Sequence, residues 1–304
     1  MKKLMIPFLL LLLVLLSACG NEAAEEKGAD KKEEKSTITY ESESGPVEVP
    51  ADPQRVIVLS SFAGNVMALD TKLVGVDSWS KMNPRYEGLE GVEEVTDDNL
   101  EKIIELNPDL IIGLSNIKNI DKLKEIAPTV TYTYGKVDYL TQHLEIGKLL
   151  NKEKEAQAWI DDFKNRAQTA GEDIKAKIGE DATVSVIENF DKQLYVFGDN
   201  WARGTEILYQ EMKLKMPEKV TEMALKDGFY AISAEVLPEY AGDYMIFSKN
   251  SDGDTSFQET ETYKNIPAVK NNQVFEANAK EFYFNDPISL DYQLEFFKKS
   301  FLAN

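Results

Sequence analysis

The sequence predicts an α/β fold: two α/β lobes with mostly parallel sheets, joined by a long rigid α-helix, with a ligand cleft between the lobes. Short β-rich runs alternate with amphipathic stretches in both halves of the chain, which is typical of parallel sheets. Between the halves, apolar residues recur at helical spacing over residues 139–178 without a proline. Two similar lobes leave a cleft between them, and ligands favour such interfaces.

The chain begins with the parts of a secretory signal. Two lysines precede an apolar run from 4 to 16, and Leu-Ser-Ala precedes Cys19, the only cysteine. The run is shorter than the about 20 residues of a transmembrane helix, so residues 1–18 are expected to be a cleaved signal peptide. This junction resembles the bacterial lipobox, which implies lipidation of Cys19; an ordinary signal peptide with an incidental cysteine is the alternative.

Residues 19–36 are expected to be the lipidated cysteine and a flexible tether. The segment from 20 onward is charged and small, with almost nothing apolar. Such a composition cannot offset the entropic cost of ordering the chain. The folded body is therefore expected to begin at residue 37.

The N-terminal lobe is expected over residues 37–138. The apolar, β-rich run at 55–59 suits a buried parallel strand, and Pro108 and Pro128 each end a helix. The expected elements, in order, are an entry hairpin at 37–49, a strand at 55–59, a helix at 64–69, a strand at 73–76, a helix at 99–106, a strand at 109–112, a helix at 120–126 and a strand at 129–134.

The connecting segment, residues 139–178, is expected to be helical. It is much longer than the usual helix of about 11–12 residues, so it is either one helix or two, with Gly147 and Gly171 as the weak points. A long helix between two lobes acts as a rigid strut and limits lobe motion to a small tilt.

The C-terminal lobe, residues 179–304, repeats the plan of the first at the level of pattern rather than residue identity. The apolar, β-rich runs alternate again with a helical stretch and end on an amphipathic one. The expected elements are strands at 183–187 and 194–197, a helix at 204–212, strands at 243–247 and 273–276, and a closing helix at 290–302.

Composition excludes several function classes. The formal net charge of −19 opposes binding to nucleic acids and to anionic lipid, so contact with a membrane is expected through the lipid anchor only. One cysteine and one histidine leave no disulfide framework and no His/Cys metal cluster. We expect no protein metal site and no cofactor.

Catalytic motifs are missing from the sequence. It has no G-x-S-x-G elbow, no glycine-rich phosphate loop and no H-E-x-x-H. The only histidine, His143, lies in the predicted strut, where a structural or solvated role is usual. We therefore expect no enzyme. A lipid-anchored hydrolase would lack a nucleophile–base pair, and a structural or adhesive surface protein would bind no small molecule tightly.

The densest candidate for ligand binding is the segment 199–204, between a predicted strand and a predicted helix. It contains Trp201 and Arg203. Arginine offers fixed, permanently charged donors to an oxygen-rich anionic ligand, and tryptophan offers a flat apolar wall. The alternative is a tryptophan packed on its own lobe and an arginine in a surface ion pair.

A second candidate is the aromatic triplet Phe282, Tyr283 and Phe284. Three consecutive aromatic residues cannot all face one core, so at least one is expected to point outward, and Tyr283 can donate a hydrogen bond there. Loops beyond the carboxyl ends of strands are the usual ligand side. Further candidates follow predicted strands or lie near them: Phe62, Trp79, Tyr134 and Tyr195.

On these residues the chain resembles the lipoprotein substrate-binding proteins of bacterial iron–siderophore ABC importers, in the ferric-hydroxamate branch of the helix-strut (class III) binding proteins. The motifs that carry the resemblance are P-x-R-V-I-V-L at 53–59, N-P-D-L-I-I at 107–112, A-P-T-V at 127–130, D-A-T-V-S at 181–185, G-D-N-W-A-R-G at 198–204, Y-A-G-D-Y at 240–244 and F-N-D-P at 284–287.

The resemblance implies a ligand of the Fe(III)-siderophore class, captured outside the cell. Trp201 and Arg203 would contact a hydroxamate siderophore, with an aromatic wall around them formed by Tyr134, Tyr195, Tyr283, Phe282, Trp79 and Phe62. Fe³⁺ favours oxygen ligands, and a hydroxamate already fills its coordination sphere, so the protein needs no metal ligand. A catecholate siderophore, haem or a corrinoid in the same fold stays open.

The resemblance also implies partners and a location. Glu101 and Glu235, one in each lobe, would dock on arginines of the ABC permease, which works with its ATPase. The protein would be a monomer, lipid-anchored on the outer face of the cell membrane of a Gram-positive bacterium. Gly113-Leu114 stands where the family leads one to expect an aromatic residue, and Phe282 and Phe284 lack hydroxyls, so the particular siderophore stays open.

Overall fold

The computed structural model describes residues 36–303. The predicted signal peptide, Cys19 and all but the last residue of the predicted tether lie outside the described residues. The described residues all belong to one structural unit. Among them, no helix combines the length and the apolar character that crossing a bilayer requires.

The described chain enters through the predicted hairpin. Strand β1 (Thr37–Ser42) pairs antiparallel with β2 (Gly45–Pro50), with Thr37 opposite Pro50 and Ser42 opposite Gly45. Gly45 has φ +109°, a left-handed conformation that glycine adopts without strain. The hairpin prediction is confirmed.

The first sheet has the order β5-β4-β3-β6-β7, and every pair in it is parallel. The predicted helices at 64–69, 99–106 and 120–126 are all observed, the last with the predicted bounds, whereas the helix at 78–82 and the strand at 93–94 were not predicted. The strands are β3 (Val56–Val58), β4 (Leu73–Val76), β5 (Glu93–Glu94), β6 (Leu110–Leu114) and β7 (Thr129–Tyr132); the helices are α1 (Ala63–Met67), α2 (Ser78–Met82), α3 (Leu100–Glu105) and α4 (Ile120–Ile126).

The second sheet has the order β10-β9-β8-β11-β12. Strand β9 runs antiparallel to both of its neighbours, and the other pairs are parallel. Four of its five strands therefore point the same way, so the sheet is mostly parallel as predicted, with one reversal. The strands are β8 (Val184–Phe190), β9 (Gln193–Phe197), β10 (Phe229–Ile232), β11 (Tyr244–Lys249) and β12 (Val274–Asn278).

The second half also contains several short helices and one long one. The segment predicted as a helix at 204–212 is a π-helix, η1 (Glu206–Glu211). The predicted closing helix is observed as α12, which begins three residues earlier than expected because Pro287 occupies its first turn and Asp286 caps it. Helix α12 spans Pro287–Leu302, and the others are α7 (Glu218–Ala224), α8 (Leu237–Tyr240), η2 (Ser256–Glu259), α9 (Glu261–Lys264), α10 (Pro267–Lys270) and α11 (Ala279–Phe282).

The connecting segment forms two helices, α5 (Tyr139–Leu149) and α6 (Glu153–Ile178). The break falls at Asn151, which has φ +56°, and not at Gly147 or Gly171, so the prediction of those glycines as weak points is wrong. A Cβ on Gly147 would lie 2.5 Å from the Cβ of Ala156, and one on Gly171 would lie 2.6 Å from the Cα of Met212. Both glycines permit close packing rather than a break.

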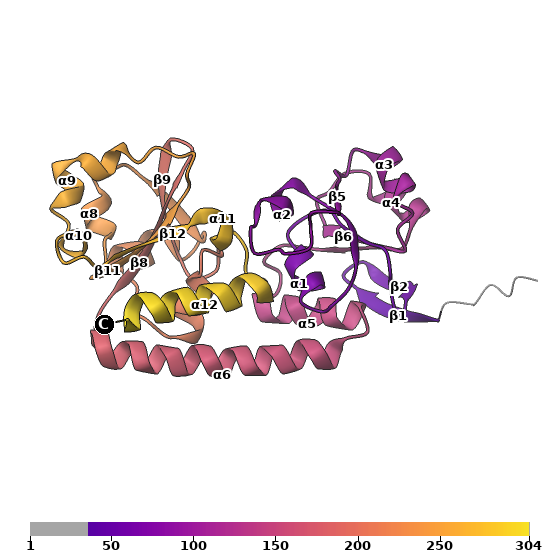
Figure 1. Ribbon diagram of the computed structural model, residues 1–304, viewed down its shortest axis with the longest axis horizontal. Helices are drawn as coiled ribbons and strands as arrows, with labels where there is room; N and C mark the ends of the chain where they lie inside the picture. Colours follow the sequence, from indigo (N-terminus) through magenta and orange to yellow (C-terminus); the bar gives the residue numbers. More distant parts are fainter. Residues whose placement is uncertain (1–35, 304) are drawn as a thin grey trace, which may run out of the picture. The chain divides into compact units, whose positions relative to one another are not determined.

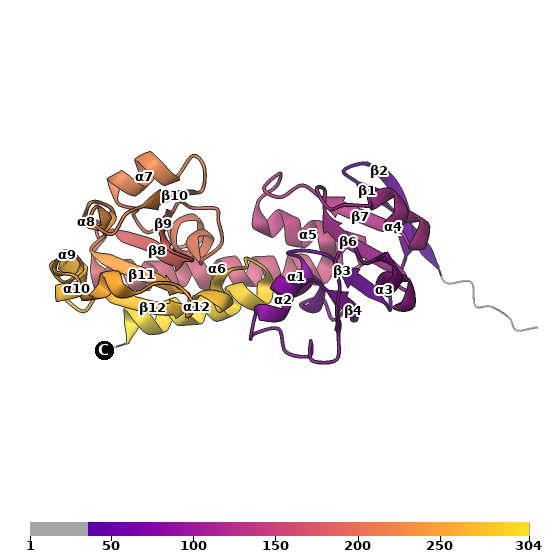
Figure 2. The ribbon, with the colours of Figure 1, turned by 90° about the horizontal axis from the view of Figure 1, so that it is seen from above.

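Helix α6 has 26 residues, which at 1.5 Å rise per residue is about 39 Å. Helix α12 packs along it (Figure 1 and Figure 2). The later residues of α5 join the core of the first half, whereas most of the buried face of α6 joins the core of the second. The segment 139–178 thus links the two cores.

A second link runs through the loop after α2. The Tyr86 hydroxyl donates to Oδ2 of Asp286 at 2.5 Å, and Asn83 Nδ2 donates to Ser289 Oγ at 3.1 Å. Arg85 pairs with Glu281 at 2.6 Å. Because these contacts join the first half to α11 and α12, they restrict how far the halves can move apart.

Candidate ligand-binding site

Two aromatic contacts bring together residues from the two halves of the chain. Tyr134, two residues beyond β7, meets the ring of Trp201 edge to face at a centroid distance of 5.8 Å. Trp79, in α2, meets Tyr283 at 5.3 Å. Tyr134 is 46% exposed and Trp79 43% exposed, so both keep ring surface for a ligand. The structure thus brings four of the predicted site residues into two neighbouring pairs.

Phe229 extends this aromatic surface. Its ring centroid lies 5.0 Å from that of Trp201 and 5.9 Å from that of Tyr195. Sequence reasoning missed it because it begins β10, which was not predicted. The signal available in the sequence is Gly228, directly before this β-rich run. In the structure its φ is +84°, and a Cβ there would lie 2.7 Å from Cε3 of Trp201. Tyr195 contacts Phe229 and no other aromatic ring among the described residues, so Phe229 lies between Tyr195 and Trp201.

Arg203 is held by a buried carboxylate. Its Nη2 and Nε lie 2.9 and 3.2 Å from the two oxygens of Glu188, in the bidentate geometry that arginine favours. Glu188 is 1% exposed and also accepts a hydrogen bond from Ser248 Oγ at 2.6 Å. The arginine is therefore in an ion pair, as the alternative interpretation held, but the pair is buried rather than on the surface.

The guanidinium of Arg203 also lies between two rings. Its Cζ is 4.9 Å from the ring centroid of Phe197 and 5.0 Å from that of Tyr283. A guanidinium has five N–H donors; two point to Glu188 and one, on Nη1, points to the Trp201 carbonyl at 3.3 Å. Each terminal nitrogen therefore has one further N–H that makes no hydrogen bond among the described residues.

The loop that carries these residues has an unusual backbone. Ala202, Arg203 and Gly204 all have positive φ, between +56° and +77°. Buried Glu206 holds this turn: its Oε1 accepts from the Ala202 N–H and from Asn285 Nδ2, each at 2.9 Å. Burial raises the pKa of Glu206. The first residue of the π-helix thus fixes the loop in front of it.

The aromatic triplet divides as expected, with one correction. Tyr283 is half-buried, and Asn250 Nδ2 lies 3.3 Å from its hydroxyl. Phe284 is buried, and Phe282 is fully buried, with ring centroids 5.2 Å from Phe296 and 5.9 Å from Phe297. The prediction that one ring points outward is confirmed. The prediction that Phe282 contacts a ligand is wrong, because it ends α11 facing the α12 side of the core.

A cavity of about 700 Å³ adjoins the aromatic pair Tyr134–Trp201. Tyr134 lines it, and so does Phe62, which is otherwise buried against Tyr132 at 5.4 Å. The remaining lining is mainly polar and comes from both halves, including Asn65 and Asn285. Trp201, Arg203 and Tyr283 do not line this cavity. The cavity and the aromatic surface therefore meet at Tyr134.

The hydroxyls of Tyr134 and Tyr283 stay protonated. Loss of solvent around the hydroxyl raises the pKa of Tyr134 to about 12. The same cause, with the nearby charge of Glu188, raises the pKa of Tyr283 to about 12. Both side chains are therefore neutral hydrogen-bond donors at physiological pH.

His143 is structural. It is 1% exposed, its Nδ1 lies 3.1 Å from Asn65 Oδ1, and its ring meets Trp159 edge to face at 5.3 Å. Burial lowers its pKa to about 4, so the ring is neutral. Within residues 36–303, no three His, Cys, Asp or Glu side chains are arranged to hold a metal ion.

Glu101 and Glu235 lie away from the aromatic cluster. Glu101 is exposed in the first turn of α3, and Glu235 is exposed two residues before α8. A hydrogen bond from Ser233 lowers the pKa of Glu235. Among the described residues, neither carboxylate has a hydrogen bond or ion pair with Tyr134, Trp201, Arg203 or Tyr283.

The chain is similar to known binding proteins over most of its length. A family model described as periplasmic binding protein matches residues 58–281. The iron(3+)-hydroxamate-binding protein FhuD of Bacillus subtilis (strain 168) is 37% identical over 301 residues, covering 96% of this chain and 95% of the relative. A second such protein from that strain, YxeB, is 37% identical over 308 residues, covering 97% and 95%.

Solved structures agree with the sequence relatives. The FhuD protein from S. pseudintermedius has a TM-score of 0.79 and 35% identity, over 88% of this chain and 99% of that one. FhuD2 from Staphylococcus aureus with bound ferrioxamine B has a TM-score of 0.78 and 34% identity, over 82% and 98%.

Proposed function

The chain belongs to the periplasmic binding protein family, and from that membership we propose that it binds a ferric hydroxamate siderophore outside the cell and delivers it to an ABC importer. The family and the fold are those of substrate-binding proteins, so the chain binds its ligand and does not convert it. The ligand is cargo, and no cofactor is needed.

The observation that carries this proposal is the aromatic surface around Arg203. The two N–H groups that Arg203 does not use internally are donors for the hydroxamate oxygens around iron. The neutral hydroxyls of Tyr134 and Tyr283 can donate beside them. Trp201 and Trp79, with Phe229 behind, offer apolar faces to the carbon chain of the ligand. A siderophore that fills the coordination sphere of Fe³⁺ requires no protein ligand to the metal.

Other predicted residues take supporting parts in this proposal. Phe62 borders the adjoining cavity at the first half, and Tyr195 supports Phe229 from behind. We also propose that residues 37–138 and 179–304 form two lobes and that the helices at 139–178 connect them.

We further propose a lipid-anchored location on the outer face of the cell membrane of a Gram-positive bacterium, through Cys19. The exposed carboxylates of Glu101 and Glu235 would dock on arginines of the permease, which is driven by its ATPase. The protein is proposed to act as a monomer. The sequence before residue 19 supports the anchor, and the exposure of the two carboxylates supports the docking.

The test of the ligand class is a titration of the mature chain, starting at Cys19, with ferrioxamine B and with a ferric catecholate. Saturable quenching of tryptophan fluorescence by ferrioxamine B alone is expected, because Trp201 and Trp79 border the site. Quenching by the catecholate alone would keep a transport role and overturn the hydroxamate. Silence to both ligands, in fluorescence and in equilibrium dialysis, would refute the proposal.

The docking proposal has its own test. The double substitution Glu101→Arg with Glu235→Arg should abolish siderophore uptake by cells and leave binding by the purified protein unchanged. Glu125→Arg with Glu172→Arg makes the same change in charge at exposed positions on α4 and α6 and should leave uptake intact. Normal uptake by the first variant would refute the docking roles.

A further inference from the structure

Tyr134 lies at the tip of a tight turn. The Lys136 N–H donates to the Thr133 carbonyl at 3.1 Å, which closes the turn around Tyr134 and Gly135. Gly135 has φ +72°, the left-handed conformation that the third residue of such turns requires. The turn follows β7 and presents the Tyr134 ring to Trp201.

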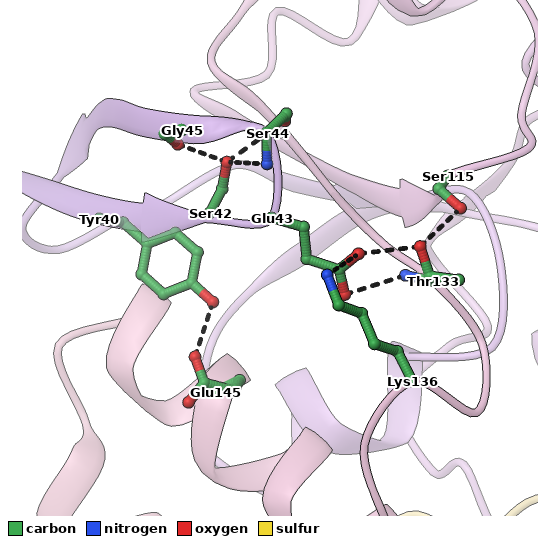
Figure 3. Close-up of polar contacts among 9 residues, drawn as sticks. All are labelled: Tyr40, Ser42, Glu43, Ser44, Gly45, Ser115, Thr133, Lys136 and Glu145. Carbon is green, nitrogen blue, oxygen red and sulfur yellow. Dashed lines mark hydrogen bonds and ion pairs between the residues drawn. The ribbon is translucent and has the colours of Figure 1, made fainter.

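One carboxylate, that of Glu43, binds both ends of this turn (Figure 3). Its Oε1 accepts from the Thr133 N–H at 3.2 Å, and its Oε2 accepts from Thr133 Oγ1 at 2.8 Å. The same Oε2 lies 3.2 Å from Lys136 Nζ. Ser115 Oγ lies 3.1 Å from Thr133 Oγ1 and adds a contact from the loop after β6.

The hairpin that carries Glu43 is itself anchored. Glu43 stands between β1 and β2, and three residues earlier the Tyr40 hydroxyl donates to Oε2 of Glu145, on α5, at 3.1 Å (Figure 3). Tyr132 donates to the Tyr40 hydroxyl at 3.1 Å, and Tyr40 is buried. Glu43 therefore reaches the turn from a base that is fixed to two elements of the first half.

Tyr134 has little else to hold it. With 46% of the residue exposed, its ring gains only part of the packing that fixes a core side chain. Partial burial of Glu43 favours its protonation, but the hydrogen bonds from Thr133 and the charge of Lys136 outweigh it and lower the pKa of Glu43. Glu43 is therefore ionised at physiological pH and holds the turn through charge-assisted hydrogen bonds.

We propose that Glu43 is a positioning residue for ligand binding: it sets the place of Tyr134 against Trp201, so that the N-terminal hairpin tunes affinity without touching the ligand. The proposal rests on the proposed function for its ligand. It assigns to the entry hairpin a part in the site that neither its place in the sequence nor its strand pattern indicates.

The test compares Glu43→Ala with Glu41→Gln. Glu41 lies on the same hairpin and its side chain makes no hydrogen bond or ion pair among the described residues, so Glu41→Gln controls for the loss of one negative charge from the hairpin. Coupled neighbours typically interact strongly enough to expect about fivefold weaker binding of ferrioxamine B by Glu43→Ala. Glu41→Gln should bind as the wild type does. Unchanged affinity in Glu43→Ala would overturn the proposal.

A double-mutant cycle shows whether Glu43 acts through Tyr134. In a Tyr134→Ala background, Glu43→Ala should cause no further loss of affinity for ferrioxamine B. An equal loss in both backgrounds would show that Glu43 acts by another route and would overturn the positioning role. If Glu43→Ala does not fold, Glu43→Gln replaces it, because glutamine keeps an acceptor for Thr133 and loses the ion pair with Lys136.

A ligand-free measurement separates this proposal from the proposed function. Amide hydrogen exchange over residues 130–138 should be faster in Glu43→Ala than in the wild type and in Glu41→Gln. If the wild type fails to bind ferrioxamine B, the proposed function falls, and the exchange result still decides whether Glu43 holds the turn. Equal exchange in all three proteins would refute that hold.

Discussion

The two halves of the molecule share one sheet plan and use it differently. Counting strands along each half, both sheets have the order 3-2-1-4-5. In the five-stranded sheet of the first half all strands are parallel, and Tyr134 simply follows the end of β7. In the second half β9 is reversed, and Trp201 and Arg203 follow that reversed strand in a loop whose residues 202–204 are left-handed. The same strand order therefore does not dictate how ligand-facing residues are presented.

Each half holds its ligand-facing residue with a carboxylate, but in different surroundings. In the second half the pair is buried: the side chains of Arg203 and Glu188 are 14% and 1% exposed. In the first half Lys136 and Glu43 are 53% and 22% exposed. Breaking a buried ion pair leaves a charge without water, whereas an exposed pair is replaced by solvent. Loss of the Glu43–Lys136 ion pair should therefore destabilise the protein less than loss of the Glu188–Arg203 ion pair.

The largest expected effect breaks the pair in the second half. Arg203→Ala leaves Glu188 buried and unpaired, which should lower the free energy of unfolding by about 3–5 kcal/mol. Lys136→Ala, the counterpart in the first half, should cost less than about 1 kcal/mol. Urea unfolding of both variants measures the difference. Removing both charges, by Arg203→Ala with Glu188→Ala, should recover part of the loss; similar costs for the two single variants would contradict the contrast.

A smaller effect concerns His143, where α5 meets α1 and α6. The pKa of this ring is lowered to about 4 in the folded state by burial, against 6.5 for an ordinary histidine. The unfolded chain therefore binds more protons between these values, so stability falls as pH drops from 6.5 to about 4. The shift corresponds to about 3 kcal/mol.

The measurement is the free energy of unfolding of the wild type minus that of His143→Gln, as a function of pH. Subtraction removes the carboxylate contributions that both proteins share. The difference should fall on acidification below pH 6.5 and be flat above it. A difference that is flat throughout would show that His143 is not buried in its neutral form.

The smallest expected effect compares the two facing aromatic residues. Trp201 is half-buried and packs against Phe229. Trp201→Ala should weaken ferrioxamine B binding by about 30-fold, as expected of an aromatic residue that a ligand buries fully. Tyr134 is more exposed, and Tyr134→Ala should weaken it by about fivefold. Isothermal titration calorimetry on both variants gives the ratio. Equal losses would mean that the two halves contribute alike and would sharpen the comparison into a symmetric one.

Much of the fold could be predicted, because prolines and apolar spacing mark where elements end. Helix α4 and the entry hairpin were predicted in this way. The reversal of β9 could not be, since an apolar run has no direction. Gly147 and Gly171 were misinterpreted because a glycine within a helical pattern has two meanings, low propensity or close packing. Only the neighbours Ala156 and Met212 decide between them.

The site was predictable in part for a similar reason. Aromatic residues in loops pointed to Trp201, Tyr134 and Tyr283, but a triplet of rings does not say which ones are buried, and Phe282 was assigned wrongly. Glu188 was missed although a charged residue inside an apolar strand needs a partner. Glu43 could not be chosen among 53 acidic residues, because only the fold brings it to Thr133.

The register of the entry hairpin has a mechanical consequence. The preceding chain is attached at Thr37, opposite Pro50, at the open end of an antiparallel pair. A pulling force applied at Thr37 would break the residue pairs between β1 and β2 one after another, starting at Thr37 and Pro50. It would have to pull the buried Tyr40 side chain out of the core before it reached Glu43. Force on the N-terminal end would therefore open the hairpin first, and it would reach the turn that presents Tyr134 only after the hairpin had opened as far as Glu43.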